Sequence, residues 1–471
     1  MEKNLVTIFS RERSRPTSEH RPHGLCDFRF HGHGHHRDTR RQENRSAQSR
    51  TCLPRRNVGP SDRSRGRIGM TIPQENCKRG PCDGLRILDF TTMISGPLCT
   101  QALGDMGADV IKVEPPAGDS ARYSGAPFRE PGFSGFLAQL NRNKRSIVVD
   151  LKSDGGRQLV LDLLPQIDVV VENFRPGVME KFDLGYSTLQ AIHPGLIYVA
   201  VNGFGSDGPY ADLPAYDQVL QGLTGLMPEQ GTPEAPALVQ GAIADKSSAL
   251  TALSGVLAAL LARERDAQHL GQRVEVAMID AFAAFALPEA MMDRAFPPLR
   301  NEFTRGADFF RTWETADGHV VGLLIQDNQF SGLCRVIDRP DIARDSRFAE
   351  MVKRFENWLE LVPLLDAEVK KLSTHEFLRR ARAEGVPFAP VNDLDAFLED
   401  PQVLHRKSII ELEDPRFGPV KYLSPPVRFE RTPASISRHA PRLGEHTDEI
   451  LDELGLSATA ISALRETGAI R

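Results

Sequence analysis

The sequence lacks glycine-rich signatures at the positions where several common enzyme folds carry them. The turn after the first predicted strand, TTMISGP (Thr91–Pro97), has no G-x-G-x-x-G spacing, so it cannot bring the backbone against a dinucleotide pyrophosphate. Neither G-x-x-x-x-G-K-[ST] nor G-x-S-x-G occurs in the chain. Nicotinamide, P-loop and serine-hydrolase interpretations are therefore disfavoured.

Long apolar runs are also missing. The longest, Ala249–Ala262, has fourteen residues, whereas a membrane span needs about 20. The run Leu5–Phe9 is too short for a secretory signal. We therefore expect no membrane partner, and we expect Ala249–Ala262 to form a buried helix.

Cysteine is sparse, with six residues at positions 26, 52, 77, 82, 99 and 334. Cys77 and Cys82 have four residues between them, but neither a second pair nor a nearby His completes a zinc pattern. Reduced thiols in a cytosolic enzyme are the simpler interpretation.

Residues 1–69 differ in composition from the rest of the chain. They hold sixteen of the 58 Lys and Arg, seven of the 63 Asp and Glu, and six of the 13 His, including the tract HGHGHH. Three interpretations remain open: a disordered basic tail, a transit-like segment with more acids than is usual, or sequence upstream of a true start at Met70. The rest of the chain is acidic, which argues against a nucleic-acid surface. We expect a cytoplasmic protein, or a mitochondrial one if the tail is a transit segment.

From Gly84 onward, short apolar runs alternate with helical patterns. Four runs are predicted strands: Gly84–Phe90, Ala108–Glu114, Asp168–Phe174 and Leu196–Gly205. Helical patterns lie between them, the clearest at Pro97–Gly107 and Gly155–Gln166, and Arg273–Leu287 changes from a strand pattern to a helical one. This alternation predicts an α/β fold with a parallel sheet buried on both faces.

One basic cluster suits a phosphate-bearing ligand. Arg142, Lys144, Arg145 and Lys152 lie close together in NRNKRSIVVDLKS. A solvated loop before a strand is the alternative interpretation of the same residues.

Two loops are candidate parts of a binding site. ENFRPGVMEK (Glu172–Lys181) follows a predicted strand, and ligands bind at the carboxyl ends of parallel strands, although a turn without a ligand is the alternative. The loop Asn202–Gln218 has three Gly and two Pro. In it, Tyr216 either lines a pocket or packs on the surface.

Asp245 is the head of the long apolar helix pattern and follows Gly241 and Ala242. Asp is a favoured N-cap residue, worth about 1 kcal/mol over Ala. A carboxylate at a helix N-terminus is also stabilised as the anion, which can attack a carbonyl carbon. The two roles are compatible, and the residues alone indicate an α/β enzyme with a candidate catalytic carboxylate.

An ordered set of motifs spans the chain from Gly84 to the C-terminus. They are GLRILDFTTMISGP, LGDMGADVIKVEPPAGDSAR, NRNKRSIVVDLK, DVVVENFRPGVMEKFDLGY, HPGLIYVAVNGFGSDGPY, LPAYDQ, GAIAD and LGEHTDEIL. Each is weak alone, but in this order they resemble the class III CoA-transferases, the CaiB/BaiF family. That family includes formyl-CoA transferase, carnitine CoA-transferase and α-methylacyl-CoA racemase.

The resemblance implies a fold. A large CoA-binding domain with a Rossmann-like parallel sheet would take residues 84–300 and 401–471, with a smaller α+β domain at 301–400 inserted between them. Two chains would interlock as linked rings, so the homodimer would be obligate.

The resemblance also implies a covalent route. Asp245, in GAIAD, would attack the thioester of an acyl-CoA to give a mixed anhydride. The CoA thiolate would then form an aspartyl-CoA thioester, and a carboxylic acid would accept the CoA. Backbone donors would stabilise each oxyanion. Acyl-CoA and the acid would be the only partners, with no metal or redox cofactor.

The binding residues that the resemblance and the basic cluster give together are Ser95, Arg122, Arg142, Lys144, Arg145, Lys152, Asn173, Phe174, Arg175, Lys181 and Tyr216. Ile94 stands where formyl-CoA transferase has Gln, and Lys181 replaces an Arg. The glycine-rich gating loop of that enzyme is also missing. These departures disfavour a formyl substrate and favour succinyl-CoA or another dicarboxylate donor.

Two alternatives to CoA transfer stay open. Racemisation needs an acid and a base at the α-carbon. The racemase branch has a His where this chain has Tyr216, and Tyr, with a reference pKa of about 10, is a poor base near neutral pH. The second alternative is a catalytically silent CoA-binding protein in which Asp245 is only a cap.

Overall fold

The protein is described by a computed structural model covering residues 80–125, 127–296 and 310–471. These residues belong to one unit, Arg67–Arg471. The interpretations of the tail, of the Met70 start and of the His-rich tract lie outside the described residues. So do Cys26, Cys52 and Cys77, whereas Cys82, Cys99 and Cys334 are buried free thiols.

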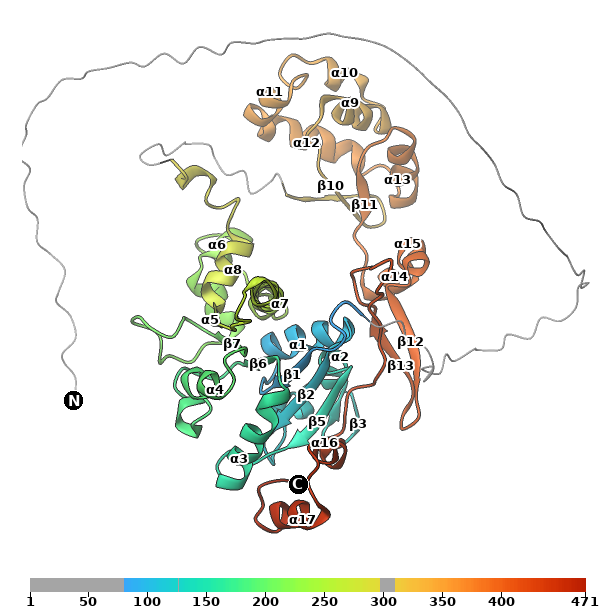
Figure 1. The fold of residues 1–471 in the computed structure, drawn as a ribbon. Helices are drawn as coiled ribbons and strands as arrows, with labels where there is room; N and C mark the ends of the chain where they lie inside the picture. The colour runs from blue at the N-terminus through green and yellow to red at the C-terminus, as the bar shows by residue number, and fades with distance from the viewer. Residues whose placement is uncertain (1–79, 126, 297–309) are drawn as a thin grey trace, which may run out of the picture. The chain divides into compact units, whose positions relative to one another are not determined.

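A six-stranded parallel sheet forms the centre of the fold (Figure 1). Its strands, in spatial order, are β5 (Lys144–Val148), β2 (Asp109–Glu114), β1 (Arg86–Asp89), β6 (Val169–Glu172), β7 (Ile197–Asn202) and β8 (Arg273–Ala277). Chain order reverses between β1 and β6, which is the Rossmann arrangement. The predicted α/β parallel sheet is confirmed, and each of the four predicted strands contains an observed one.

Neighbouring residues of each strand bury opposite faces of the sheet. Ile87 joins one hydrophobic core, and Leu88 joins the other. The first core includes helices α1 (Ser95–Asp105), α7 (Ile243–Arg265) and α8 (Met278–Ala286). The second includes α3 (Asp154–Leu163), α4 (Tyr186–Ile192), α16 (Thr447–Glu453) and α17 (Ala458–Glu466). Burial on both faces explains why the strands are almost continuously apolar.

Helix α7 is the one helix among the described residues that is long and apolar enough to cross a membrane, by length and composition alone. Its buried residues, among them Ala252, Val256 and Ala259, belong to the core on the α1 side of the sheet. Residues 249–262 therefore form the predicted helix, but only one of its faces is buried in the core. The other face, with Leu250, Leu257 and Leu261, is exposed in the single chain. That helix begins at Ile243, two residues before Asp245.

A third hydrophobic core is formed by residues of the segment 313–388. It contains an antiparallel sheet of β9 (Thr312–Glu314), β10 (His319–Gly322) and β11 (Phe388–Pro390). The helices in this stretch are α9 (Asp327–Val336), α10 (Pro340–Arg344), α11 (Met351–Glu356), α12 (Trp358–Val369) and α13 (Thr374–Ala383).

The C-terminal residues return to the large sheet. Ile450 and Ile461 join its second core, and Ile470 bridges to Val149 just after β5. The remaining elements are β3 (Phe128–Glu130), β4 (Phe133–Ser134), α2 (Gly135–Leu140), α5 (Asp217–Leu223), α6 (Leu226–Gln230), α14 (Leu394–Glu399), α15 (Pro401–Arg406), β12 (Ile409–Asp414) and β13 (Gly418–Leu423), with short 3-10 turns between some of them.

Candidate active site

The candidate site lies where the strand order reverses, at the carboxyl ends of β1 and β6. Ligands of open parallel sheets bind at this position. Asn173, directly after β6, joins the two strand ends through its amide. Its Oδ1 accepts from the backbone N–H of Thr92 at 2.8 Å, and its Nδ2 donates to the Thr92 carbonyl at 2.9 Å. The amide also donates to Ser95 Oγ at 3.4 Å.

The loop between β1 and α1 is held in an unfavourable conformation. Met93 has a φ of 64°, in the left-handed region that a residue with a Cβ rarely adopts. Its N–H donates to Asp119 Oδ1 at 3.1 Å, and Lys112 Nζ donates to the Thr91 carbonyl at 2.7 Å. Buried side chains thus fix the backbone that leads to Ser95. Strain of this kind is concentrated at functional sites.

The charges that hold this loop are paired beneath it. Lys112 lies 2.9 Å from Asp119, and Lys144 lies 2.9 Å from Asp89, with all four side chains fully buried. Burial alone would raise the pKa of Asp89, but Lys144, Lys112 and a hydrogen bond from Thr91 lower it to about 2. Asp89 is therefore a permanent anion that positions the loop.

Asp245 is the third residue of α7, whose N-cap is Ala242. The N-cap interpretation of Asp245 is therefore wrong. A carboxylate from another helix caps α7 instead. Asp217, the first residue of α5, accepts from the Ala244 N–H in the first turn of α7 at 3.0 Å. Gly241 precedes this start with a φ of 93°, which favours glycine. The side chain of Asp245 is thus free of a capping role in its own helix.

Several groups act on the ionisation of Asp245. The hydroxyl and the backbone N–H of Ser95, at the start of α1, lower the pKa of its carboxyl. Burial and, after it, the negative charge of Asp217 raise the pKa of Asp245 to about 6, against the opposing effects of Ser95 and Lys246. The result is a half-buried carboxylate that is mostly ionised at neutral pH yet more basic than an ordinary Asp. Such groups are suited to nucleophilic attack.

Four residues expected to bind CoA form buried or nearly buried ion pairs within the protein instead. Lys144 and Arg145 lie in strand β5, which excludes the alternative of a solvated loop. Arg145 pairs with Asp109 and Glu453, Arg142 with Asp105, and Arg122 with Glu114. These three guanidinium groups are nearly buried and hold their partners through more than one bond. We therefore leave Arg122, Arg142, Lys144 and Arg145 out of the proposed CoA site.

The other expected binding residues are more accessible. Arg175 and Lys181 are exposed in the segment after β6, and Phe174 is half-buried there. Lys152 is exposed after β5, which is three strand spacings from β6, or roughly 14 Å along the sheet.

Tyr216 is the N-cap of α5, and 72% of it is exposed in the single chain. It therefore lines no enclosed cavity formed by this chain alone.

Some features of the site were missed in the sequence. Asp217 follows Tyr216 in LPAYDQ, and an acid at the start of a helical pattern is a signal that could have identified it. The loop after β7 contains the spacing G-x-G-x-x-G at Gly203–Gly208, but it runs into irregular structure and not directly into a helix. The bond from Asn173 to Thr92 has no local signal, because the two residues are 81 positions apart.

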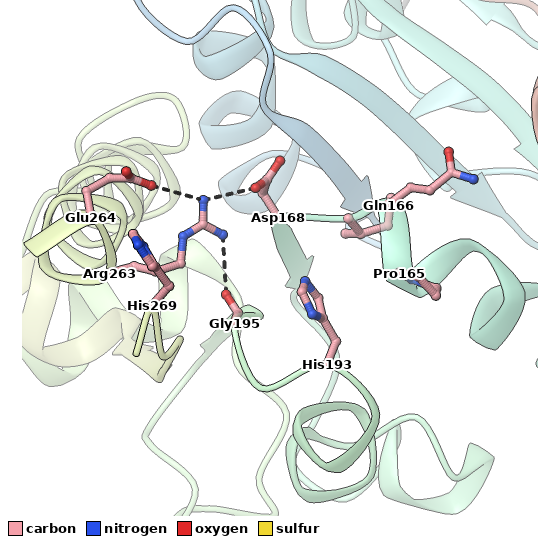
Figure 2. Close-up of a pocket in the computed structure, with 9 residues that line it drawn as sticks. Pro165, Gln166, Asp168, His193, Gly195, Arg263, Glu264 and His269 are labelled. Atoms are coloured by element: carbon pink, nitrogen blue, oxygen red, sulfur yellow. Dashed lines mark hydrogen bonds and ion pairs between the residues drawn. The ribbon is translucent and has the colours of Figure 1, made fainter. Parts of the chain in front are cut away.

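A hollow of about 360 Å³ lies at the other end of the sheet, before β6 and β7 (Figure 2). In it, Arg263 of α7 donates to the Gly195 carbonyl at 3.3 Å and pairs with Asp168 at 2.9 Å. Arg263 follows Asp245 by eighteen residues, or about 27 Å of helix. This hollow is therefore separate from the candidate site.

Metal-site chemistry has little support in this part of the chain. Within the ranges that the structure describes, no three His, Cys, Asp or Glu side chains are grouped as a metal site would require.

Comparison with known proteins decides the family. A family model described as CoA-transferase family III matches residues 82–447. The chain belongs to CoA-transferase family III. Among family III relatives, it is 33% identical to succinate–glutarate CoA-transferase of Agrobacterium fabrum, covering 80% of this chain and 96% of that protein. It is 32% identical to human succinyl-CoA:glutarate CoA-transferase, covering 90% and 97%.

Solved structures of family III agree with the fold. A CaiB/BaiF family protein from Brucella suis superposes with a TM-score of 0.69 at 33% identity, covering 80% of this chain and all of that one. A protein from Mycobacterium tuberculosis gives a TM-score of 0.71 at 31% identity. The resemblance to the class III CoA-transferases is therefore confirmed.

Proposed function

We propose that this protein transfers CoA from an acyl-CoA donor to a free carboxylic acid, with Asp245 as the nucleophile. The observation that carries the proposal is the environment of Asp245. Its half-buried carboxylate lies in the first turn of α7, which packs against α1, and burial together with the charge of Asp217 keeps it more basic than an ordinary Asp. A capping role does not account for Asp245, because Asp217 already accepts the N–H bond at the start of α7.

The proposed reaction has four balanced steps. An Asp245 oxygen attacks the donor carbonyl carbon, and the carbon–sulfur bond breaks to release CoA thiolate and leave a mixed anhydride. The thiolate attacks Asp245 Cγ and expels the donor acid, which leaves an aspartyl-CoA thioester. The acceptor carboxylate then attacks Cγ and expels the thiolate, giving a second anhydride. The thiolate finally attacks the acceptor carbonyl and restores Asp245, without any net proton transfer.

The proposed substrates are dicarboxylates. The relatives are named for transfers between succinyl-CoA and acids such as glutarate, D-citramalate and mesaconate. This supports succinyl-CoA, or a similar donor, for the present chain. For the CoA phosphates we propose the exposed cations Arg175 and Lys181, with Lys152 as an outer contact.

We also propose an interlocked homodimer with residues 301–400 as an inserted domain. Large apolar side chains on the helices of the first core remain exposed in the single chain: Leu250, Leu257, Leu261 and Phe285. A second copy that covers them would remove this apolar surface from water.

The first test is Asp245→Asn, with Asp280→Asn as the matched control. Asp280 is an exposed acid and the third residue of α8, so it has the same position in its helix as Asp245 but lies outside the candidate site. We expect Asp245→Asn to lower CoA exchange between succinyl-CoA and glutarate by at least about 1,000-fold, and Asp280→Asn to keep it. Hydroxylamine added with succinyl-CoA should inactivate and mark the wild type and Asp280→Asn but not Asp245→Asn, as read by intact-protein mass spectrometry.

Two outcomes would count against the proposal. Near-normal turnover by Asp245→Asn would remove Asp245 as the nucleophile. Exchange of the α-proton of a 2-methylacyl-CoA in D₂O, without CoA transfer to any acid, would favour the racemase alternative.

A further inference from the structure

The loop between β1 and α1 carries one exposed apolar side chain. From Leu85 to Met106 every other residue is buried or half-buried, whereas 36% of Met93 is exposed. This loop lies at the carboxyl end of β1, where ligands of open parallel sheets bind. An apolar group that is exposed at this edge is accessible to a ligand.

The backbone of Met93 is unusual for its residue type. In the part of the chain that the structure describes, six residues other than glycine have a positive φ. Four of them are Asn, Asp or His, which adopt this conformation more readily than other residues. The fifth, Lys407, ends helix α15, where left-handed residues are common. Met93, with a φ of 64°, has neither explanation, and glycine would suit its backbone better.

The conformation is imposed by hydrogen bonds to three consecutive residues, 91–93. The carbonyl of residue 91 accepts from Lys112 at 2.7 Å, and the N–H of Met93 donates to Asp119 at 3.1 Å. Between them, the N–H and the carbonyl of residue 92 both bond to the Asn173 amide. Strained residues persist where the surrounding structure over-determines them, and such positions cluster at functional sites. These bonds fix the backbone from which the Met93 side chain projects.

The loop that carries Met93 lies between the proposed nucleophile and the proposed phosphate contacts. Helix α1 begins at the carboxyl edge of the sheet and packs against α7. Helix α7 ends at the opposite edge, where Arg263 bonds to the segments before β6 and β7, so its first turn, with Asp245, also lies at the carboxyl edge. On the other side, residue 92 is bonded to Asn173, and the exposed Arg175 follows two positions later. A CoA thioester that reaches from Arg175 to Asp245 would therefore cross this loop.

We infer that the Met93 side chain contacts the pantetheine arm of the bound acyl-CoA. This inference rests on the proposed function, which supplies the acyl-CoA as the ligand. The arm is a flexible chain of methylene and amide groups, and the unbranched, polarisable Met side chain adapts well to such a partner. A glycine would relieve the backbone strain but would offer no side chain for this contact.

The test compares two probes that differ by the arm. Coenzyme A carries the pantetheine arm, whereas adenosine 3′,5′-bisphosphate is the nucleotide part of the same molecule without it. Met93→Ala should weaken the binding of coenzyme A by about 10-fold, because an apolar contact is lost, and leave the binding of the bisphosphate unchanged. Met93→Leu keeps the size of the side chain and should bind coenzyme A within about threefold of the wild type. Isothermal titration calorimetry of the full chain measures both affinities.

Two glycine variants separate the contact from the strain. Met93→Gly loses the same side chain as Met93→Ala but relieves the left-handed conformation, so it should melt at a higher temperature than Met93→Ala. Its loss of coenzyme A affinity should nevertheless be the same. Lys407→Gly is the matched control, because it relieves the same conformation outside this loop, and it should bind both probes like the wild type.

The inference and the proposed function can fail separately. Unchanged coenzyme A affinity in Met93→Ala and Met93→Gly would overturn the inference. Equal weakening of both probes in these variants would also overturn it, since the side chain would then support the shape of the site and not contact the arm. A wild type that binds neither probe would overturn the proposed function itself.

Discussion

Two carboxylates meet at the start of one helix, and they have different tasks. Asp217 is buried, accepts bonds from Gln221 and from the Ala244 N–H, and is tied to the backbone. Asp245, the third residue of α7, is half-buried and has a pKa of about 6. Environments that separate two nearby acids in this way are a common means of dividing chemical roles.

This division predicts the effect of Asp217→Asn. The charge of Asp217 raises the pKa of Asp245, so its removal should lower that pKa toward the ordinary Asp value. Asp245 would then stay ionised at lower pH. The acid limb of kcat/KM should move down from about pH 6. Measurement of the pH profile checks this, and an upward movement would show that Asp217 does not act through its charge.

At the scale of elements, the parts predicted from sequence are those with a local cause. The apolar strands and the long helix follow from residue periodicity, and all were found. The ion pairs of β5 could not be predicted, because Lys144 lies 55 positions from Asp89. A dense cluster of cations in sequence therefore suggested a phosphate site, whereas the fold pairs Arg142, Lys144 and Arg145 with acids and leaves Lys152 exposed. Proximity in sequence cannot distinguish these cases.

The β5 ion pair predicts a large stability effect. Lys144→Met should lower the free energy of unfolding by about 3–5 kcal/mol, because it leaves Asp89 buried without its cation. The double variant Asp89→Asn/Lys144→Met should lose less than the sum of the two single variants. Urea denaturation of the four proteins measures both quantities. Additive losses would mean that the pair is not coupled.

At the scale of the whole molecule, the candidate site holds its acid, Asp245, within one chain but is open to solvent. Tyr216 is exposed, and apolar side chains remain uncovered on α7 and α8. Sequence could indicate the family and the position of Asp245. It could not indicate what covers this surface, which we propose is a second chain.

The proposed homodimer predicts a particle of twice the 52.2 kDa chain mass. Sedimentation equilibrium should give this mass for the full chain, and a chain lacking residues 1–69 should give twice its own shorter mass with the same melting temperature and activity. A monomer that retains full activity would contradict the interlocked arrangement.

The contacts of Arg263 at the C-terminal end of α7 have a consequence for how the acceptor specificity of this enzyme can change. Arg263 ties the last turn of the helix to Asp168 and to the Gly195 carbonyl (Figure 2). Because α7 is held in this way, the proposed nucleophile Asp245 cannot shift along the helix axis to reach shorter or longer acids. Substitutions that change the acceptor acid should therefore occur in the surrounding loops, such as Asn202–Gln218, and not in α7.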